Sequence, residues 1–244
     1  MVKAKWHYYI RRAHRYLGVF LGIQFLAWTV GGLYFSWTNI NAVTGDTLRK
    51  SVPLLTTGFN IVSPSIVLDK MRQTVAVDTV TSIQLINVAD SLYYQILYTS
   101  KQVNKVQLAH AQTGALRPAL NEKEAVDLAL SRFKEKVKVK KVEYMTESNG
   151  HHEYRKKPLP AFVVHLEHET NTRIYVAAEL GIVQNFRNDQ WRIYDFLWML
   201  HTMDFQERSN FNNWLIRGVS ILGLITLASG FTLFVVSSKR GFKK

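Results

Sequence analysis

The stretch Tyr16–Trp37, YLGVFLGIQFLAWTVGGLYFSW, contains no charged residue. A helix of roughly 20 apolar residues crosses a hydrocarbon core about 30 Å thick, so this stretch is predicted to be a transmembrane helix. The alternative is a cleaved signal peptide, whose apolar part is shorter, about 7–15 residues, and precedes a small-residue cleavage site. The length of the stretch and its closing aromatic residues favour an uncleaved anchor.

A second apolar stretch, Leu215–Val236, LIRGVSILGLITLASGFTLFVV, is predicted to be a second transmembrane helix. Basic residues flank the two stretches at the ends of the chain: Lys3, Lys5, Arg11, Arg12 and Arg15 before the first, and Lys239, Arg240, Lys243 and Lys244 after the second. By the positive-inside rule, both termini are expected in the cytoplasm. The residues between the spans then form an extracytoplasmic domain.

The formal net charge is +13, which in another kind of protein would suggest nucleic acid as a partner. Here nine of the 31 basic residues lie outside the two spans, at the ends of the chain, and all 18 acidic residues lie between the spans. The remainder of the chain therefore has a net charge of only +4. We therefore expect no nucleic acid, and anionic lipid headgroups are the natural partner of the excess charge. The absence of cysteine excludes disulfides, thiolate metal sites and thiol catalysis.

The pattern of apolar and polar segments divides the chain into eight predicted parts. They are a cytoplasmic basic tail (1–15), the first transmembrane helix (16–37), a connector (38–62), a first repeat (63–120), a second repeat (121–188), an interfacial amphipathic helix (189–205), the second transmembrane helix (215–236) and a cytoplasmic basic tail (237–244).

Each repeat is predicted to contain one helix followed by three antiparallel strands. Ser63-Pro64 is a helix start with a capping serine, and Asn121 with Glu124 resembles a capping box. The strand-like runs cover 80–88, 91–99 and 104–111 in the first repeat and 137–146, 160–169 and 172–179 in the second. Neither half is large enough to bury much apolar surface alone, so we expect both to pack as one α+β domain.

These segments resemble the PepSY domain and the transmembrane helices associated with it. AHAQTGAL (109–116) and VAAELGIVQN (176–185) are similar to the closing strand and turn of a PepSY unit. His14-Arg15-Tyr16-Leu17-Gly18 is similar to the family's His-Arg-x-x-Gly opening, and Thr29 to Leu33 to its Thr-Gly-Leu close. Leu200-His201 and Ala228-Ser229-Gly230-Phe231 are similar to the motifs around its last span, with serine in place of threonine.

The resemblance implies a bacterial inner-membrane protein with a periplasmic domain. Some members of the family are linked to iron or siderophore uptake and to transmembrane reduction through histidine-bound haem, and others are accessory binding modules. Larger members have more than two spans. A haem with two axial histidines would therefore require this chain to dimerise or to use a membrane partner.

Two histidines are candidate haem ligands. His14, Gly18 and Gly22 follow one helix face, which is either a small-residue seam for another helix or homodimer, or a face that leaves room for a flat cofactor bound by His14. His201 belongs to an aromatic stripe in DQWRIYDFLWMLHTMDF (189–205), which is either a membrane-surface anchor or a haem-packing face. In the expected topology the two histidines lie at opposite membrane faces and cannot share one haem.

His151, His165 and His168 are weaker candidates for a zinc or iron site, because they accompany carboxylates. The alternative, which we favour, is a solvated polar hairpin without a metal. The sequence contains no nucleophile elbow, HExxH motif or phosphate loop, so catalytic activity of the chain alone is not expected. Two hypotheses remain: a non-catalytic, membrane-anchored binding or accessory module, and a haem-bearing electron-transfer subunit that helps to reduce a ferric complex. A third hypothesis is that the outer domain binds a ligand and signals to the cytoplasm. It has little support, because only short cytoplasmic tails are expected to receive such a signal.

Overall fold

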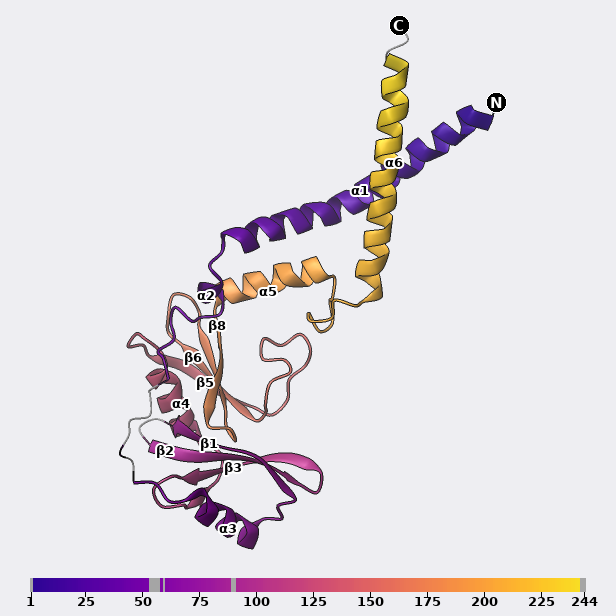
Figure 1. Ribbon diagram of the computed structural model, residues 1–244. Helices are drawn as coiled ribbons and strands as arrows, with labels where there is room; N and C mark the ends of the chain where they lie inside the picture. The colour runs from indigo at the N-terminus through magenta and orange to yellow at the C-terminus, as the bar shows by residue number, and fades with distance from the viewer. Residues whose placement is uncertain (1, 53–57, 59, 89–90, 242–244) are drawn as a thin grey trace. The chain divides into compact units, whose positions relative to one another are not determined.

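The computed structural model describes the backbone of residues 2–52, 58, 60–88 and 91–241, and the side chains of helical residues from 8 to 238. Parts of the expected connector (38–62) and of both basic tails lie outside the described residues. The chain divides into two compact units, one formed by residues 1–38 with 193–244 and the other by residues 39–192. Each unit is described by itself (Figure 1).

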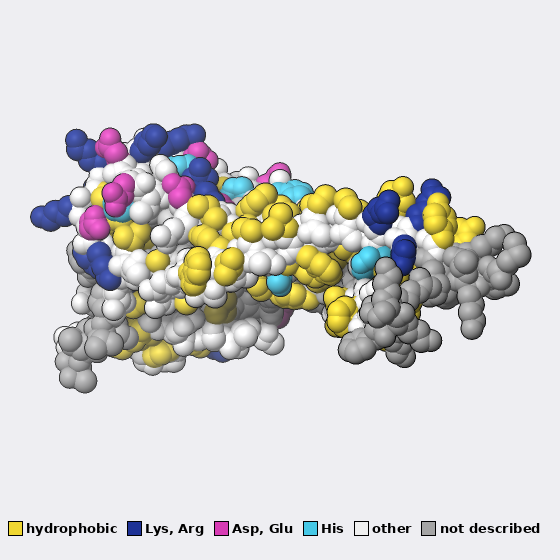
Figure 2. All heavy atoms as spheres, turned by 90° about the horizontal axis from the view of Figure 1, so that it is seen from above, with side chains coloured by type: hydrophobic (Ala, Val, Ile, Leu, Met, Phe, Trp, Pro, Cys, Tyr) yellow, Lys and Arg dark blue, Asp and Glu magenta, His cyan; other side chains and the backbone are white. Residues whose placement is uncertain are grey.

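The first unit consists mainly of two long helices, α1 (Val2–Trp37) and α6 (Trp214–Gly241). Within them, residues 8–37 and 214–238 are long and apolar enough to cross a membrane. Their apolar side chains are mostly uncovered: Phe20, Ile23, Leu224 and Phe231 are each more than 60% exposed. Figure 2 shows hydrophobic side chains along much of the surface seen in that view, and basic side chains towards both of its ends. Such an uncovered apolar surface is suited to lipid contact.

Glycines of α6, rather than those of α1, allow the two long helices to approach each other. A Cβ atom at Gly223 would lie 3.2 Å from the Phe25 ring, and one at Gly230 would lie 3.2 Å from the His14 ring. By contrast, a Cβ atom at Gly18 or Gly22 would meet nothing within 4 Å. Gly18 and Gly22 of α1 therefore contact no other described segment of the chain.

A third helix, α5 (Asp189–Thr202), packs its last turn against α1. The Gln24 side chain donates to the Leu200 carbonyl (3.1 Å), and the Trp28 indole donates to the His201 carbonyl (3.0 Å). The last carbonyls of a helix lack partners within the helix, so these two bonds satisfy groups that would otherwise be costly to bury. This explains the single amide side chain in the Tyr16–Trp37 stretch.

The second unit contains two four-stranded antiparallel sheets, each preceded by a helix. The first repeat has α3 (Pro64–Thr74), β1 (Thr79–Val88), β2 (Ser91–Ser100), β3 (Val103–His110) and β4 (Leu116–Arg117). The second has α4 (Glu122–Ser131), β5 (Val139–Met145), β6 (Ala161–Leu166), β7 (Arg173–Ala177) and β8 (Ile182–Arg187). A short helix, α2 (Ile40–Val43), precedes both. The α+β class and the repeated order of elements are confirmed.

The helix starts are confirmed in detail. The Ser63 hydroxyl accepts from the Ser65 amide at the start of α3. At α4 the Asn121 side chain accepts from the Glu124 amide, and the Glu124 carboxylate accepts from the Asn121 amide, which completes the capping box.

The expected count of three strands per sheet is wrong, because each sheet has a fourth. Gly114 (φ +65°) and Gly181 (φ +67°) adopt the left-handed conformation and turn the chain back, so that β4 pairs with β3 and β8 with β7. In β8, Val183 faces Val176 and Asn185 faces Tyr175, which leaves Gln184 as an extra, bulged residue. A bulge breaks the two-residue alternation that marks a strand in a sequence.

Each sheet packs with its helix around a buried cluster of its own, and the end of β1 joins the cluster of the second sheet. Val88 at the end of β1 is buried in the same cluster as α4 and the inner face of the second sheet. A Cβ atom at Gly181 would lie 3.0 Å from Leu108 of β3, and the Gln95 side chain of β2 donates to the Leu180 carbonyl. The two halves thus pack as one unit, and a cavity lined by apolar and basic residues lies where they meet.

Candidate functional site

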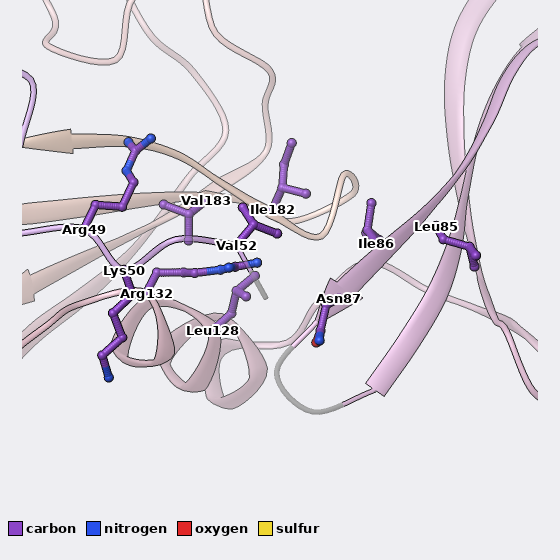
Figure 3. A pocket seen from close by; sticks show the side chains of 10 residues that line it. All are labelled: Arg49, Lys50, Val52, Leu85, Ile86, Asn87, Leu128, Arg132, Ile182 and Val183. Atoms are coloured by element: carbon purple, nitrogen blue, oxygen red, sulfur yellow. The ribbon is translucent and has the colours of Figure 1, made fainter. Parts of the chain in front are cut away.

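A groove lies between the first and second sheets (Figure 3). It has a volume of about 310 Å³, which is at the lower end of the range typical of ligand pockets, about 300–1,000 Å³. We call it the inter-sheet groove, and its ten lining residues are Arg49, Lys50, Val52, Leu85, Ile86, Asn87, Leu128, Arg132, Ile182 and Val183. Six of them are aliphatic, three are basic, one is an amide and none is acidic.

Arg132, the C-cap residue of α4, is the basic residue that enters the groove. In Figure 3 its guanidinium lies between Val52 and Leu128, whereas the Lys50 side chain points away from them. The guanidinium donates to the Ser51 carbonyl (3.3 Å) and pairs with no carboxylate among the described residues. Burial, together with the positive charge of Arg49, holds the pKa of Arg132 below its ordinary value. An anion bound in the groove would offset both the loss of hydration of the guanidinium and its repulsion by Arg49.

Arg49 is held at the edge of the groove by an aromatic ring. Its guanidinium lies 4.7 Å from the centre of the Phe186 ring, and its Nη1 lies 3.7 Å from an Asp46 carboxylate oxygen. Its Nε is buried and has no hydrogen-bond partner within the described part of the chain. The Arg49 side chain therefore adds positive charge that one distant carboxylate only partly balances.

Asn87 provides an unused acceptor in the same groove. It lies on β1 opposite Leu92, and in Figure 3 it lies across the groove from the basic residues, beyond Leu128. Its Oδ1 is buried without a partner among the residues that the structure describes. A buried acceptor without a donor costs about 1–3 kcal/mol, which a ligand N–H group would recover.

His14 lies on α1 beside α6. Its Nδ1 is 2.7 Å from the Ser229 hydroxyl, which also lies 2.8 Å from the Thr226 carbonyl. A hydroxyl has one hydrogen, and a carbonyl can only accept. Both contacts are hydrogen bonds only if Ser229 donates to the Thr226 carbonyl and His14 donates through Nδ1–H. The neutral tautomer with a free Nε2 lone pair, the form that binds metals, is then fixed.

An apolar recess adjoins the His14 ring. It has a volume of about 500 Å³ and is lined by His14, Thr226, Leu227, Gly230, Phe231 and Phe234. The absence of a side chain at Gly230 is what lets the imidazole approach α6. Gly18, one turn along α1 from His14, faces open space and contributes no contact.

His201 lies in a different part of the helical unit. Its ring is within 6.2 Å of the rings of Trp28, Phe35 and Trp198, measured between centroids, and its Nδ1 is buried without a partner among the described residues. Trp28 is 14 residues along α1 from His14, or about 21 Å at 1.5 Å per residue. The two imidazoles therefore cannot bind one metal ion within a single chain.

The three other histidine candidates have separate surroundings. His165 Nε2 lies 3.3 Å from Glu143, and His168 Nε2 lies 3.2 Å from Glu135, while His151 lies in an exposed loop. The described residues contain no group of three or more His, Cys, Asp or Glu side chains that could hold a metal ion. The structure thus does not bring His151, His165 and His168 together as one ligand set.

Glu153 forms a buried polar centre beside the second sheet. Its carboxylate, only 10% exposed, accepts from the Tyr175 hydroxyl (2.6 Å), from Arg173 (3.1 Å) and from Arg192 (3.0 Å). Burial alone would raise its pKa, but the Tyr175 hydrogen bond and the two arginines outweigh burial and hold it below the ordinary value. Both carboxylate oxygens accept hydrogen bonds, so this centre contributes to the stability of the fold.

The groove residues Arg132 and Asn87 were not found by sequence reasoning. Asn87 does carry a signal, since it is a polar residue between Ile86 and Val88 in a strand whose end is buried. Arg132 directly follows the apolar face of α4 and carries no such signal. Its role depends on how the second sheet packs on the first.

Comparison of the chain with models of known protein families, with curated proteins and with solved structures gave no match. The resemblance to the PepSY family therefore depends on the motifs around His14, His201 and the two strand-and-turn segments alone.

Proposed function

We propose that the chain is a membrane-anchored, non-catalytic binding protein of the PepSY type, which serves as an accessory module of a complex in the bacterial inner membrane. In this proposal α1 and α6 cross the bilayer with both termini in the cytoplasm, and residues 39–192 are periplasmic. The family resemblance favours a complex linked to iron uptake. The inter-sheet groove is the observation that carries the proposal.

The groove combines three features of a binding site. It is concave, its aliphatic residues include members of both sheets, and its basic residues have no acidic counterpart among the ten described residues that line it. The exposed apolar surfaces of α1 and α6 and the open Gly18 and Gly22 face supply the membrane contact and a face for a helix of a partner or of a second copy.

Site-specific photocrosslinking in living cells tests this function. A photoreactive amino acid is placed at Val52, which is 66% exposed and lines the groove, and in a matched control at Val103, which is 57% exposed on β3 and does not line it. A discrete adduct from position 52 alone is expected. If position 52 gives no adduct, or the same adducts as position 103, the groove is not the binding site and the proposal is wrong.

A second candidate function, haem-dependent electron transfer, is favoured by the geometry of His14. The free Nε2, the oriented tautomer and the adjoining apolar recess fit one axial ligand of a haem, which would supply one-electron chemistry when bound. His201 of α5 lies beside Trp28, about 21 Å along α1 from His14, and is too far away to be the second ligand of the same haem. That ligand would have to come from a second copy or from a partner subunit.

The absorption spectrum of the full chain, purified in mild detergent after expression with ample haem, tests this second function. A Soret band that His14→Ala abolishes and that Ser229→Ala weakens would support it, because loss of a group that orients a ligand typically costs about 10- to 100-fold in affinity. His152→Ala, in the other unit, is the control. A colourless protein would refute haem binding and leave the first function unaffected.

A further inference from the structure

The ligand class of the inter-sheet groove can be argued from its polar groups, on the premise that the groove is the binding site proposed above. Arg132 offers a guanidinium beside Val52 and Leu128, and within the described part of the chain this group makes one hydrogen bond, to the Ser51 carbonyl. Arg49 and Lys50 add positive charge at the same end, and none of the described residues that line the groove is acidic. A planar carboxylate matches a guanidinium fork better than any neutral group does.

The opposite side of the groove requires a donor. The buried Oδ1 of Asn87 lacks a partner among the described residues, and only an N–H or O–H group can satisfy it. A fatty acid carries a carboxylate and an apolar chain but has no such donor when ionised. A peptide end carries a carboxylate, a backbone N–H and apolar side chains together.

We propose that the inter-sheet groove binds the C-terminus of an apolar peptide, with its carboxylate on Arg132, a backbone N–H on Asn87 Oδ1 and its side chains against Ile86, Ile182 and Val183. The cavity volume of about 310 Å³ accommodates a short peptide end and not a folded partner. The occupant is thus a terminal segment, from a partner protein or from a free peptide of the periplasm.

The binding assay uses the full chain in lipid nanodiscs and the tripeptide glycyl-leucyl-leucine, labelled at its amino end with a dye and followed by fluorescence anisotropy. The same peptide with a C-terminal amide is the first comparison. The free acid is expected to bind about 10- to 100-fold more tightly than the amide, the range for a hydrogen-bonded pair with a charged group. Equal binding of acid and amide by the wild type overturns the inference, and this comparison needs no variant.

Substitutions locate the contact. Arg132→Gln should weaken the acid to the level of the amide and leave the amide unchanged, and Asn87→Leu should weaken both peptides. Arg72→Gln is the matched control, because Arg72 lies on α3 outside the groove and its side chain is 69% exposed. If Arg132→Gln lowers the thermal midpoint strongly, Arg132→Lys keeps the charge and should give an intermediate loss. Unchanged acid binding in a folded Arg132 variant overturns the inference.

Competition with decanoate distinguishes a peptide from a lipid ligand. If decanoate displaces little of the labelled peptide, at concentrations at which unlabelled peptide displaces it fully, the peptide ligand is supported. If decanoate binds and the peptide does not, the inference is overturned. A groove adduct from Val52 with no peptide binding would refute only this inference. If neither an adduct nor peptide binding were found, the proposed function would fail as well.

Discussion

Glu153→Gln should destabilise the unit formed by residues 39–192, because it removes the charge at the centre of the Glu153 network. Tyr175 is fully buried, and its hydroxyl bonds to this carboxylate at 2.6 Å. Hydrogen bonds to charged groups contribute roughly 1.5–3 kcal/mol each, but Arg173 and Arg192 are 40% and 27% exposed, so water offsets much of their loss. Counting the Tyr175 bond as one and the two arginines together as one more, each at the lower end of that range because glutamine keeps one acceptor oxygen, gives about 3 kcal/mol.

This loss corresponds to a fall of about 6–12 °C in the unfolding midpoint, at about 2–4 °C per kcal/mol for a unit of this size. The assay is the thermal unfolding of the full chain in nanodiscs, followed by tryptophan fluorescence. Glu143→Gln is the matched control, because Glu143 lies on β5, is 44% exposed, and pairs with Lys141 and His165. The control should change the midpoint by less than about 2 °C. Equal shifts in the two variants would refute the argument that burial makes the Glu153 network strong.

The pH dependence of the same variant provides an internal check. The pKa of Glu153 is lowered by folding, so its stabilising effect is fully present above the ordinary value of 4.5 and is lost as the pH falls through the lower folded value. The difference in midpoint between wild type and Glu153→Gln should therefore be constant from pH 6 to 8 and shrink below about 4.5.

Two further predictions concern the same unit. Gly45→Ala should lower the free energy of unfolding by about 2–4 kcal/mol, because Gly45 has φ +77° and an added Cβ would lie 2.7 Å from Cβ of the buried Phe186. The control is Gly32→Ala in α1, where an added Cβ meets nothing within 4 Å and no measurable change is expected in the same thermal assay. Equal effects of the two substitutions would contradict the close contact at Gly45. Burial raises the pKa of Tyr154 to about 12, so the neutral hydroxyl stabilises the fold below about pH 10 and this stabilisation is lost as the pH rises from 10 to 12. The unfolding midpoint should therefore fall less steeply between pH 10 and 12 in Tyr154→Phe than in wild type. Identical slopes would contradict this.

Local signals in the sequence predicted the secondary structure well. Ser63-Pro64 and the Asn121–Glu124 capping box predicted two helix starts correctly, because capping depends on residues three positions apart or less. The fourth strands were missed for a local reason too, since Gln184 bulges out of β8 and the two-residue β4 is too short to show alternation.

The candidate sites depend on contacts that no local pattern contains. His14 and Ser229 are 215 positions apart, and only the packing of α6 on α1 shows that the hydroxyl orients the imidazole. Arg132 and Asn87 belong to different repeats and line one groove because Val88 and α4 share a core. The family resemblance did emphasise His14, but it gave no indication of the groove.

The sidedness of the membrane tests the account most directly, because a periplasmic groove requires it. The chain contains no cysteine, so single cysteines at Lys105, exposed on β3, and at Ser238, exposed near the end of α6, can be labelled selectively. A membrane-impermeant maleimide applied to intact spheroplasts should label the cysteine at position 105 at once and the cysteine at position 238 only after the membrane is permeabilised. Labelling of position 238 with protection of position 105 would contradict the account.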